Sequence, residues 1–434
     1  MPGLVRVLGG IAVTLASTCF VALSFASPAD AAPTISGDAA DPDLVNDGGD
    51  WWMVTTNHGF GNVPRWRSSN PTGGWRWAGD ALPRVPAWAT PGFTWAPTLM
   101  PLADGTWALY VAAHHTASGR QCIAVALGAS PGATFTPVDT GPIVCQLDRG
   151  GSIDPAAFVD DDGSRFLVWK SDDNAIGRPA SLFAQRLSAD GRRLEGPAAR
   201  LLDHDRSWEV PLIENPEMVR DDGRLLLLYS AGWWESDGYV TGVAECSSPL
   251  GPCRKVTSQC AWSAPTAGLR GAGGASVEID DTGRAWMAVH AWTGRPGYRF
   301  GTSRAAHVIP VELPGSDGVD AAALGRIDRL YLAVLGREPD QGGRREWTEH
   351  HRCGMPLDGV AGHLTRSPEF ASRFGRPDDA TFVDLLYRNV LGRPADPGGR
   401  RHWAGALASG VTRPDLITQF SESREFVSEY ARRG

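Results

Sequence analysis

Three acidic residues occur at similar places in the sequence, each next to a proline-containing segment. Asp41 begins Asp-Pro-Asp, Asp154 lies in Ile-Asp-Pro, and Glu214 lies in Ile-Glu-Asn-Pro. Carboxyl groups brought together in a confined site separate in pKa, so that one can donate a proton while another accepts one. The pattern therefore indicates acid–base chemistry, provided that the fold brings these side chains together.

A repeated turn-and-strand unit predicts how the acidic residues could meet. A glycine-containing turn followed by an apolar strand occurs five times, with turn glycines at Gly48, Gly105, Gly163, Gly223 and Gly283. Asp-Gly between two strand-like segments favours a hairpin, because both central residues of a type I′ turn have positive φ. Five units of about 60 residues, each with room for four short strands, predict an all-β five-bladed β-propeller over residues 32–313.

The strand that enters each hairpin contains the acidic residues. Counting nine residues back from the turn glycine gives Ala96, Asp154, Glu214 and Gly274 in blades 2 to 5, and Asp41 lies seven back in blade 1. On this count, three of five equivalent positions are carboxylates. If these strands are the innermost of each blade, the three carboxylates meet at one mouth of the central channel.

Taken in order, these motifs resemble those of glycoside hydrolase family 43. The segments are Asp41-Pro42-Asp43, Trp95-Ala96-Pro97, Ile153-Asp154-Pro155, Ile213-Glu214-Asn215-Pro216 and Val289-His290-Ala291-Trp292. The resemblance implies an inverting hydrolase that acts on arabinofuranosyl or xylosyl linkages of polysaccharides or oligosaccharides.

The resemblance also implies a role for each acidic residue. Asp41 matches the general base, Glu214 the general acid, and Asp154 the carboxylate that orients the acid and modulates its pKa. In an inverting glycosidase the acid and the base are ~6.5–9.5 Å apart, which leaves room for the attacking water. Candidate substrate contacts are Trp95, Trp169 and His290.

Three other acidic residues lie near these motifs and are either less favoured candidates for the general acid or structural residues. Glu209 and Glu217 are alternatives for the general acid. Glu217 is an odd number of strand positions from Glu214, which turns it to the other face of a regular strand. We expect Asp43, which shares a face with Asp41, to serve structure.

The sequence gives little sign of a metal or cofactor. Many family members have Gly-x-Gly-His in the fifth blade, where the histidine organises a central ion or water, but this chain has Gly271-Ala272-Gly273-Gly274. We therefore expect no required cofactor, and a central calcium ion is disfavoured. No cysteine pair has the C-x2-C spacing of a zinc site. We expect His114 and His115 to be polar residues at a strand end.

Residues 1–31 have the pattern of a secretory signal peptide, with an apolar run and a small-x-small cleavage site. They predict a secreted, extracellular protein, and no other stretch has the ~18–20 apolar residues of a membrane span. Six cysteines remain after cleavage, and an oxidising compartment favours disulfides. The preferred local pairs are Cys122 with Cys145 and Cys246 with Cys253.

Composition and net charge limit the kinds of molecule that this protein is expected to bind. Apolar residues make up 42% and charged residues 21% of the chain, as in ordinary globular proteins. The net charge of −8 lies before residue 316, because the remaining residues contain 17 basic and 17 acidic side chains. Without a basic patch, nucleic acid is disfavoured and a neutral polysaccharide or oligosaccharide is expected. The 17 tryptophans suit stacking on sugar rings.

The C-terminal part has helical periodicity. Residues 314–325 are predicted to be a linker, and residues 326–434 a small all-α domain. Leu-Tyr-x-x-Val-Leu-Gly-Arg occurs twice with an offset of 56, which predicts two repeats. The pattern resembles domain of unknown function 4214. Its balanced charge predicts an attachment or packing module that binds a surface or a protein partner.

Two other classes of function remain open. A non-catalytic glycan-binding propeller would be expected to have lost one of the three carboxylates, and none is lost. In a surface-adhesion protein the activity would depend on residues 316–434, whereas a hydrolase would keep its activity on small substrates without them.

Overall fold

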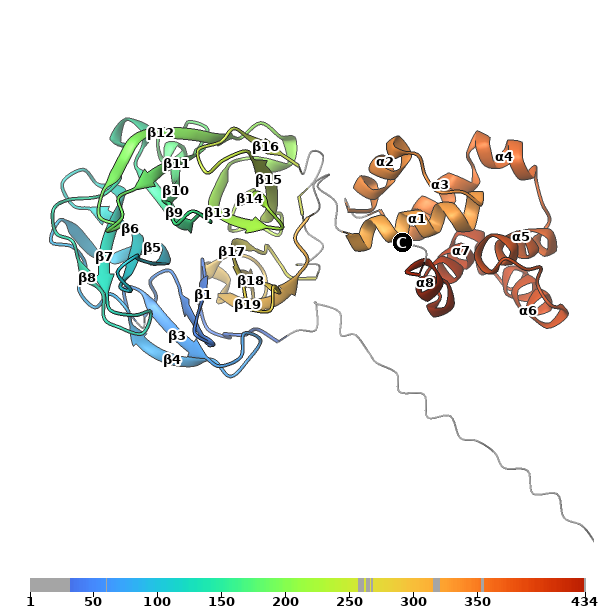
Figure 1. Cartoon of the computed structure of the whole chain (residues 1–434), viewed down its shortest axis with the longest axis horizontal. Helices are drawn as coiled ribbons and strands as arrows, with labels where there is room; N and C mark the ends of the chain where they lie inside the picture. Colours follow the sequence, from blue (N-terminus) through green and yellow to red (C-terminus); the bar gives the residue numbers. More distant parts are fainter. Residues whose placement is uncertain are drawn as a thin grey trace, which may run out of the picture.

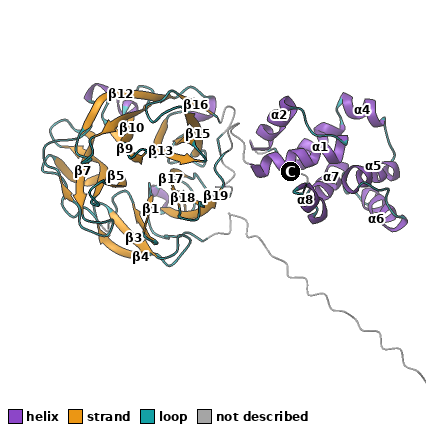
Figure 2. Ribbon diagram, in the orientation of Figure 1, coloured by secondary structure: helices purple, strands orange, loops and turns teal. Residues whose placement is uncertain are grey.

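The structure is a computed structural model of the 434-residue chain. It describes residues 32–59, 61–256, 261–262, 266, 268–314, 321–352 and 355–432. An all-β region is followed by a helical region, as predicted (Figures 1 and 2). The predicted signal peptide lies outside the described residues.

The strands form five antiparallel sheets arranged in a ring (Figure 1). Residues of all five blades line a cavity on the axis of the ring, the central channel. Blade 1 contains β1 (Asp43–Asp47), β2 (Asp50–Val54), β3 (Pro64–Ser68) and β4 (Arg76–Asp80). Blade 2 contains β5 (Ala89–Pro101), β6 (Trp107–His115), β7 (Arg120–Gly128) and β8 (Thr136–Pro137). Blade 3 contains β9 (Ser152–Val159), β10 (Arg165–Ser171), β11 (Ser181–Leu187) and β12 (Leu194–Asp203).

The remaining two blades complete the ring. Blade 4 contains β13 (Ile213–Asp221), β14 (Arg224–Ala231), β15 (Val240–Cys246) and β16 (Cys253–Lys255). Blade 5 contains β17 (Gly273–Ile279), β18 (Ala285–Trp292) and β19 (Arg304–Val311). The first strand of each blade faces the channel, and neighbouring first strands contact one another around it.

The N-terminal end of the described region closes the propeller. Ile35 and Ala306 of β19 exchange two backbone hydrogen bonds of 3.1 and 3.2 Å. The start of the chain thus extends the last blade, which leaves fewer unpaired groups at the edge of β19. Apolar residues pack between neighbouring blades, and one such cluster joins blades 3 and 4 through Phe158, Val168 and Leu227.

Two disulfides fasten short segments to blades 2 and 4. They join Cys122 to Cys145 and Cys246 to Cys253, which confirms both predicted pairs.

The predicted position of the acidic residue in blade 4 is wrong by one residue, because the hairpin turn of that blade is shorter than expected. Asp221 pairs with Arg224, so Asp222 and Gly223 form a two-residue turn, whereas the corresponding loop of blade 3 has five residues, 160–164. The shorter turn moves the equivalent position one residue toward the C-terminus, from Glu214 to Asn215. Two of the five equivalent positions are therefore carboxylates, not three.

Eight helices follow among the described residues: α1 (Ala321–Leu335), α2 (Gln341–Arg352), α3 (Leu357–Thr365), α4 (Pro368–Phe374), α5 (Asp379–Leu391), α6 (Pro397–Ala408), α7 (Arg413–Ser421) and α8 (Arg424–Tyr430). Helices α6, α7 and α8 begin 56 residues after α2, α3 and α4, the same offset as in the sequence. Thr412 and Asp415 form the capping box at the start of α7. Within the described residues, no helix has both the length and the apolar character needed to cross a membrane.

Candidate active site

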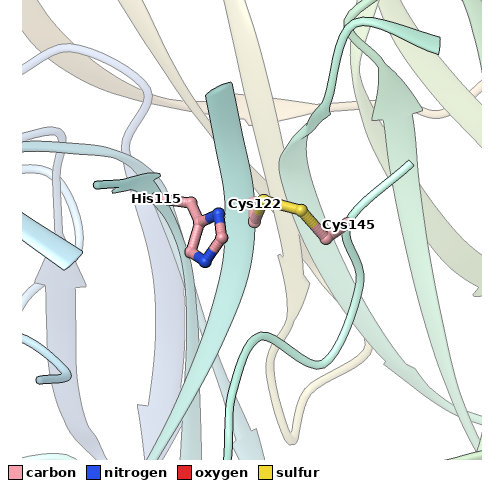
Figure 3. Close-up of side chains that lie close together, drawn as sticks. All are labelled: His115, Cys122 and Cys145. Atoms are coloured by element: carbon pink, nitrogen blue, oxygen red, sulfur yellow. A yellow bond between two sulfur atoms is a disulfide. The ribbon is translucent and has the colours of Figure 1, made fainter. Parts of the chain in front are cut away.

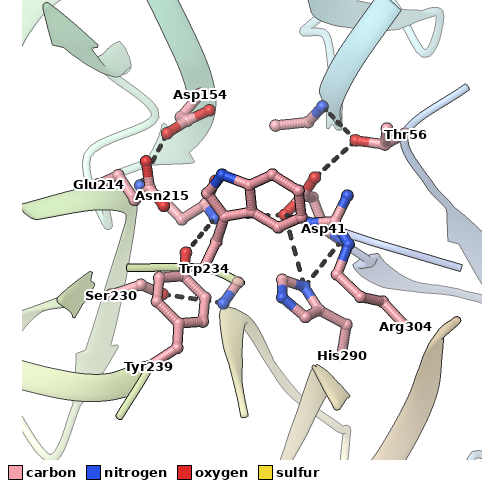
Figure 4. A network of polar contacts seen from close by, with 12 residues as sticks. Asp41, Thr56, Asp154, Glu214, Asn215, Ser230, Trp234, Tyr239, His290 and Arg304 are labelled. Atoms are coloured by element: carbon pink, nitrogen blue, oxygen red, sulfur yellow. Dashed lines mark hydrogen bonds and ion pairs between the residues drawn. The ribbon is translucent and has the colours of Figure 1, made fainter. Parts of the chain in front are cut away.

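A cavity of about 540 Å³ opens at one mouth of the propeller channel. Asp41, Asp154 and Glu214 line it, so the fold brings the three predicted carboxyl groups to one cavity (Figure 4). Trp95 also lines it and is 37% exposed, as a substrate contact requires. The other lining residues include Asp38, Thr56, His58, Lys170, Asp172, Asn215, Trp233, Trp234, Tyr239, Tyr298 and Arg304.

The backbone turns sharply at the same place in every blade. Asp41, Ala96, Asp154, Asn215 and Gly274 have φ between 43° and 61°, and the ladder is interrupted at this point in blades 2 to 5. Non-glycine residues in this region are strained by on the order of 1–3 kcal/mol each, and such residues cluster at functional sites. At Asp41, Asp154 and Asn215 this backbone turn directs the side chain toward the mouth of the channel.

Asp41 is held by polar partners from four other segments. The Thr56 hydroxyl donates a 2.6 Å hydrogen bond to Oδ2, and the Asn215 amide donates one of 3.3 Å to Oδ1. An Arg304 nitrogen lies 3.6 Å from Oδ1. Burial raises the pKa of Asp41, but the Arg304 guanidinium and these hydrogen bonds outweigh it and lower the pKa overall. Asp41 is therefore a carboxylate at neutral pH.

His290 lies beneath Asp41 and is completely buried. Its Nδ1 accepts a 3.1 Å hydrogen bond from the backbone N–H of Asp41. Burial, followed by the nearby Arg304 charge, lowers the pKa of His290 to about 3, so the ring is neutral and its proton is on Nε2. A side chain at Gly274 would approach Nδ1 to 2.8 Å, so His290 fills the space that a larger residue there would need.

Glu214 and Asp154 lie together on the side of the cavity opposite Asp41 (Figure 4). The Lys170 ammonium on β10 donates a 3.0 Å hydrogen bond to Glu214 Oε2. Burial, together with the Glu214 and Asp41 charges, raises the pKa of Asp154 to about 8, although the Lys170 charge opposes the shift. In the free protein Asp154 therefore holds a proton at neutral pH.

Asn215 joins the two sides of the site. Its backbone N–H donates to Asp154 Oδ2 at 3.0 Å, and its side-chain amide donates to Asp41 Oδ1. The same amide lies 3.0 Å from the Tyr239 hydroxyl, whose ring stacks on His290. One residue thus fixes the relative positions of the two carboxyl groups.

Aromatic side chains form one wall of the cavity. Trp234 stacks on Trp292, and the Arg304 guanidinium lies 4.9 Å from the Trp234 ring. Trp233 is 44% exposed at the rim. Flat apolar faces above a polar floor suit a sugar ring.

Two predicted substrate contacts are wrong. Trp169 is 1% exposed, stacks on Phe183 and donates to Gln146, because its position on β10 faces the space between blades. His290 contacts Asp41 and lies outside the cavity lining, because it is on the middle strand of its blade.

The alternatives for the general acid lie away from the cavity. Glu209 is completely buried, 2.7 Å from Lys255, and accepts a hydrogen bond from Tyr229. Glu217 lies further along the channel and accepts a hydrogen bond from the backbone of Val277. Neither residue lines the large cavity.

Few side chains in the described part of the chain are grouped as metal ligands would be. The one cluster of three or more His, Cys, Asp or Glu ligand atoms there is His115, Cys122 and Cys145 (Figure 3). Both sulfur atoms belong to a disulfide, and His115 also contacts Ser118. Among the described residues, the mouth carboxyl groups do not form such a cluster.

Several residues of the site were not predicted. Lys170 had a usable signal, because it is one of only two lysines in the chain. Arg304 is one of 39 arginines, and nothing in the sequence distinguishes it. Counting nine residues back from Gly223 gives Glu214 instead of Asn215, because the blade 4 turn is shorter than the turn of blade 3.

The geometry supplies the parts of an acid–base reaction. A carboxylate lies on one side of the cavity and a carboxyl pair that holds a proton lies on the other. Water activated at Asp41 and a leaving oxygen protonated from the Asp154–Glu214 side would together cleave a bond between them.

Comparisons with known proteins agree with this arrangement. The family model "Glycosyl hydrolases family 43" matches residues 31–314, and the model of domain of unknown function 4214 matches residues 361–430. The chain is similar to "Alpha-L-arabinofuranosidase 43" of Humicola insolens, with 32% identity over 39% of this chain and 36% of that protein. It is also similar to "Xylan 1,3-beta-xylosidase" of a Vibrio species, with 25% identity over 48% of this chain and 39% of that protein.

The chain thus spans less than two fifths of the length of these curated relatives. Among solved structures, a thermostable family-43 glycoside hydrolase has the same fold, with a TM-score of 0.56 and 24% identity. That match covers 65% of this chain and 91% of the other.

Proposed function

Because this chain belongs to glycosyl hydrolases family 43, we propose that it is a secreted inverting glycoside hydrolase of arabinofuranosyl or xylosyl linkages. The substrate class follows the names of the two curated relatives, an arabinofuranosidase and a xylosidase. The observation that carries the proposal is that three carboxyl groups line one cavity, with Asp41 beside Arg304 and Glu214 beside Lys170.

In the proposed reaction Asp41 is the general base. Its carboxylate accepts a proton from water as the water oxygen attacks the anomeric carbon. Arg304 and Thr56 keep Asp41 ionised and oriented before the substrate arrives. Preorganised partners of this kind avoid rearrangement during the reaction.

Glu214 is the proposed general acid, and Asp154 its proton reservoir. Both side chains line the cavity: Glu214 accepts a hydrogen bond from Lys170, and Asp154 accepts one from the Asn215 backbone. A proton moves from Asp154 to Glu214 and then to the glycosidic oxygen, whose bond to the anomeric carbon breaks. The products are a free sugar of inverted configuration and an alcohol.

A substrate panel tests the proposal. The panel contains p-nitrophenyl furanosides and pyranosides, linear arabinan and xylan, and compares the wild type with Glu214→Gln and Asp41→Asn. We expect hydrolysis of an arabinofuranoside or a xyloside, with kcat lowered by about 10²–10⁴-fold in both variants. Glycan binding without hydrolysis by the wild type would favour the non-catalytic binding protein instead.

The helical region is proposed to be an attachment module that binds a surface or a protein partner. Its helices pack around a core of their own, which includes Leu330, Phe382 and Leu416. Removal of residues 315–434 should leave hydrolysis of small substrates unchanged. Loss of that activity would contradict the division of roles.

A further inference from the structure

The two lysines of the chain occupy matching environments. Lys170 is 1% exposed and pairs with Glu214, while Lys255 is 8% exposed and pairs with Glu209. All 39 other basic residues, histidines aside, are arginines. The lysine ammonium is a compact charge on a flexible side chain, whereas the planar arginine guanidinium needs more room and more hydrogen-bond acceptors. Each lysine therefore places one compact cation against a buried glutamate, and Lys255 also contacts Asp205.

The surroundings of Lys170 contain more acidic groups than its charge can balance. Glu214, Asp154 and Asp172 all interact with its ammonium group. The acidic and titratable groups that face this cluster are Asp154 on β9, Glu214 on β13, Asp172 and Asp173 after β10, Asp41 before β1 and Tyr239 before β15. Two arginines also face it: Arg120 on β7, and Arg149, which pairs with Asp173 at 2.7 Å. A buried site avoids net charge, so part of this cluster must be protonated.

The direction in which each pKa around Lys170 is shifted agrees with a cluster that keeps one proton. Burial raises the pKa of Asp154 to about 8 and also raises the pKa of Asp172, in both cases against the opposing charge of Lys170. Burial lowers the pKa of Lys170, but Glu214 and Asp154 outweigh burial and raise it overall. Lys170 therefore stays charged, and the proton of the carboxyl pair resides on Asp154.

We propose that Lys170 is a positioning residue that fixes the Glu214 carboxylate and carries the counter-charge needed when the Asp154–Glu214 pair releases its proton. This role rests on the proposed function. When the pair gives its proton to the leaving oxygen, the C1–O bond breaks with its electrons on that oxygen, and both carboxyl groups are left ionised. The Lys170 ammonium, which interacts with both carboxyl groups, stabilises that state and so makes the pair a stronger acid.

The pH–rate profile distinguishes this role from simple support of the fold. In Lys170→Met we expect kcat near pH 7 to fall at least tenfold and the alkaline limb to move up by about one pH unit or more, because the pair holds its proton more tightly. Lys170→Arg keeps the charge and should leave the limb near its wild-type position. A lower rate in Lys170→Met with an unmoved alkaline limb would overturn the proposal.

Lys255→Met is the matched control. It also removes a buried lysine from a glutamate, but Glu209 lies outside the cavity lining. We expect a lower thermal midpoint and an unmoved alkaline limb. An equal limb shift in Lys255→Met would show that the effect is not specific to the acid side of the site.

A second measurement needs neither activity nor a destabilised variant. A wild-type sample labelled with ¹³Cε-lysine should give two lysine signals, because the chain has two lysines, and Lys255→Met assigns them. We expect the Lys170 signal to stay at its ammonium position and to shift in one step as the carboxyl pair ionises, with no such step for Lys255. The step should disappear in Asp154→Asn.

The two measurements separate failure of this inference from failure of the proposed function. A Lys170 signal without a step, or one unchanged in Asp154→Asn, would refute the charge coupling even in an active hydrolase. If no glycoside is hydrolysed but the step is present, the coupling holds and the proposed function fails.

Discussion

Two groups of carboxyl groups lie along the propeller channel and differ in their partners. The mouth acids are Asp41, Asp154 and Glu214, and the deep acids are Asp43, Glu217 and Glu278. Each mouth acid has a cation nearby, either Arg304 or Lys170. The deep acids have only backbone N–H groups and hydroxyl groups as partners among the described residues: Leu99 and Thr98 for Asp43, Val277 and Ser276 for Glu217, and Asn46 for Glu278.

Only at Asp41 does the nearby cation outweigh burial. Burial raises the pKa of Asp43 to about 7 and that of Glu278 to about 8, and it raises the pKa of Glu217. Asp41 is also surrounded by protein, yet the charge of Arg304 lowers its pKa. Burial is thus common to both groups. Arg304 separates the carboxylate of Asp41 from the protonated deep acids, whereas at Asp154 the Lys170 charge does not outweigh burial and the proton is kept.

Removal of Arg304 should leave Asp41 without a nearby cation, as in the deep acids. We expect this change to lower kcat/KM more than any other change below. In Arg304→Met the pKa of Asp41 should rise, so the acidic limb of the pH–rate profile moves to higher pH and kcat/KM at pH 6 falls by about 10²–10³-fold. Steady-state kinetics from pH 4 to pH 9 measures both effects. Arg270→Met, at an exposed arginine paired with Asp237, is the control. An unmoved acidic limb would remove Arg304 from the account.

The same substitution in the two groups should have unequal effects on turnover. Asp154→Asn removes the proton reservoir and should lower kcat by about 10²-fold, whereas Asp43→Asn should change kcat by no more than about threefold. Single-turnover kinetics on one activated glycoside compares them. Equal losses would mean that the deep acids take part in the reaction.

Stability should depend on pH in opposite directions at the two sites. The folded-state pKa of Asp43 is raised from 3.8 to about 7, so its contribution to stability is fully present below pH 3.8 and is lost as pH rises to about 7. Asp41 has a lowered pKa, so its contribution is present above pH 3.8 and is lost as pH falls.

Asp43→Asn should remove the first of these dependences. We expect the variant to be more stable than the wild type at pH 8 by roughly 2–4 kcal/mol, with a smaller difference at pH 4. Urea unfolding at the two pH values measures it. A gain that is the same at both values would show that the proton on Asp43 is not the cause.

The smallest effect should come from the aromatic rim of the mouth. Trp95→Ala should raise KM by about 2–10-fold with little change in kcat, because it removes a stacking face and no proton. Trp169→Ala, which empties a buried site between blades, should instead lower stability by about 3–5 kcal/mol. Michaelis constants and thermal midpoints separate the two. A large loss of kcat in Trp95→Ala would give Trp95 a role beyond binding.

The sequence predicted the elements better than the partners. The repeated turns are local signals, so the five blades and both disulfides could be predicted from them. The offset of 56 residues likewise predicted how α2 to α4 recur as α6 to α8. Asp41 and Glu214 line the cavity as expected, because each lies near the first strand of its blade and these strands surround the channel.

Long-range contacts explain what the sequence did not predict. Arg304 meets Asp41 across 263 positions of sequence only because the ring closes between blades 5 and 1. The blade 4 register was wrong by one because glycine spacing does not reveal a two-residue turn. Trp169 was wrongly placed because the side of a blade that a tryptophan faces depends on the neighbouring blade.

The configuration of the first product tests the central assignment most directly. ¹H NMR of a fast wild-type digestion of the best substrate in the panel identifies the anomer that forms before mutarotation. If Asp41 activates water against the Asp154–Glu214 side, the inverted anomer appears first. First appearance of the retained anomer would contradict the account, because Asp41 would then attack the sugar itself.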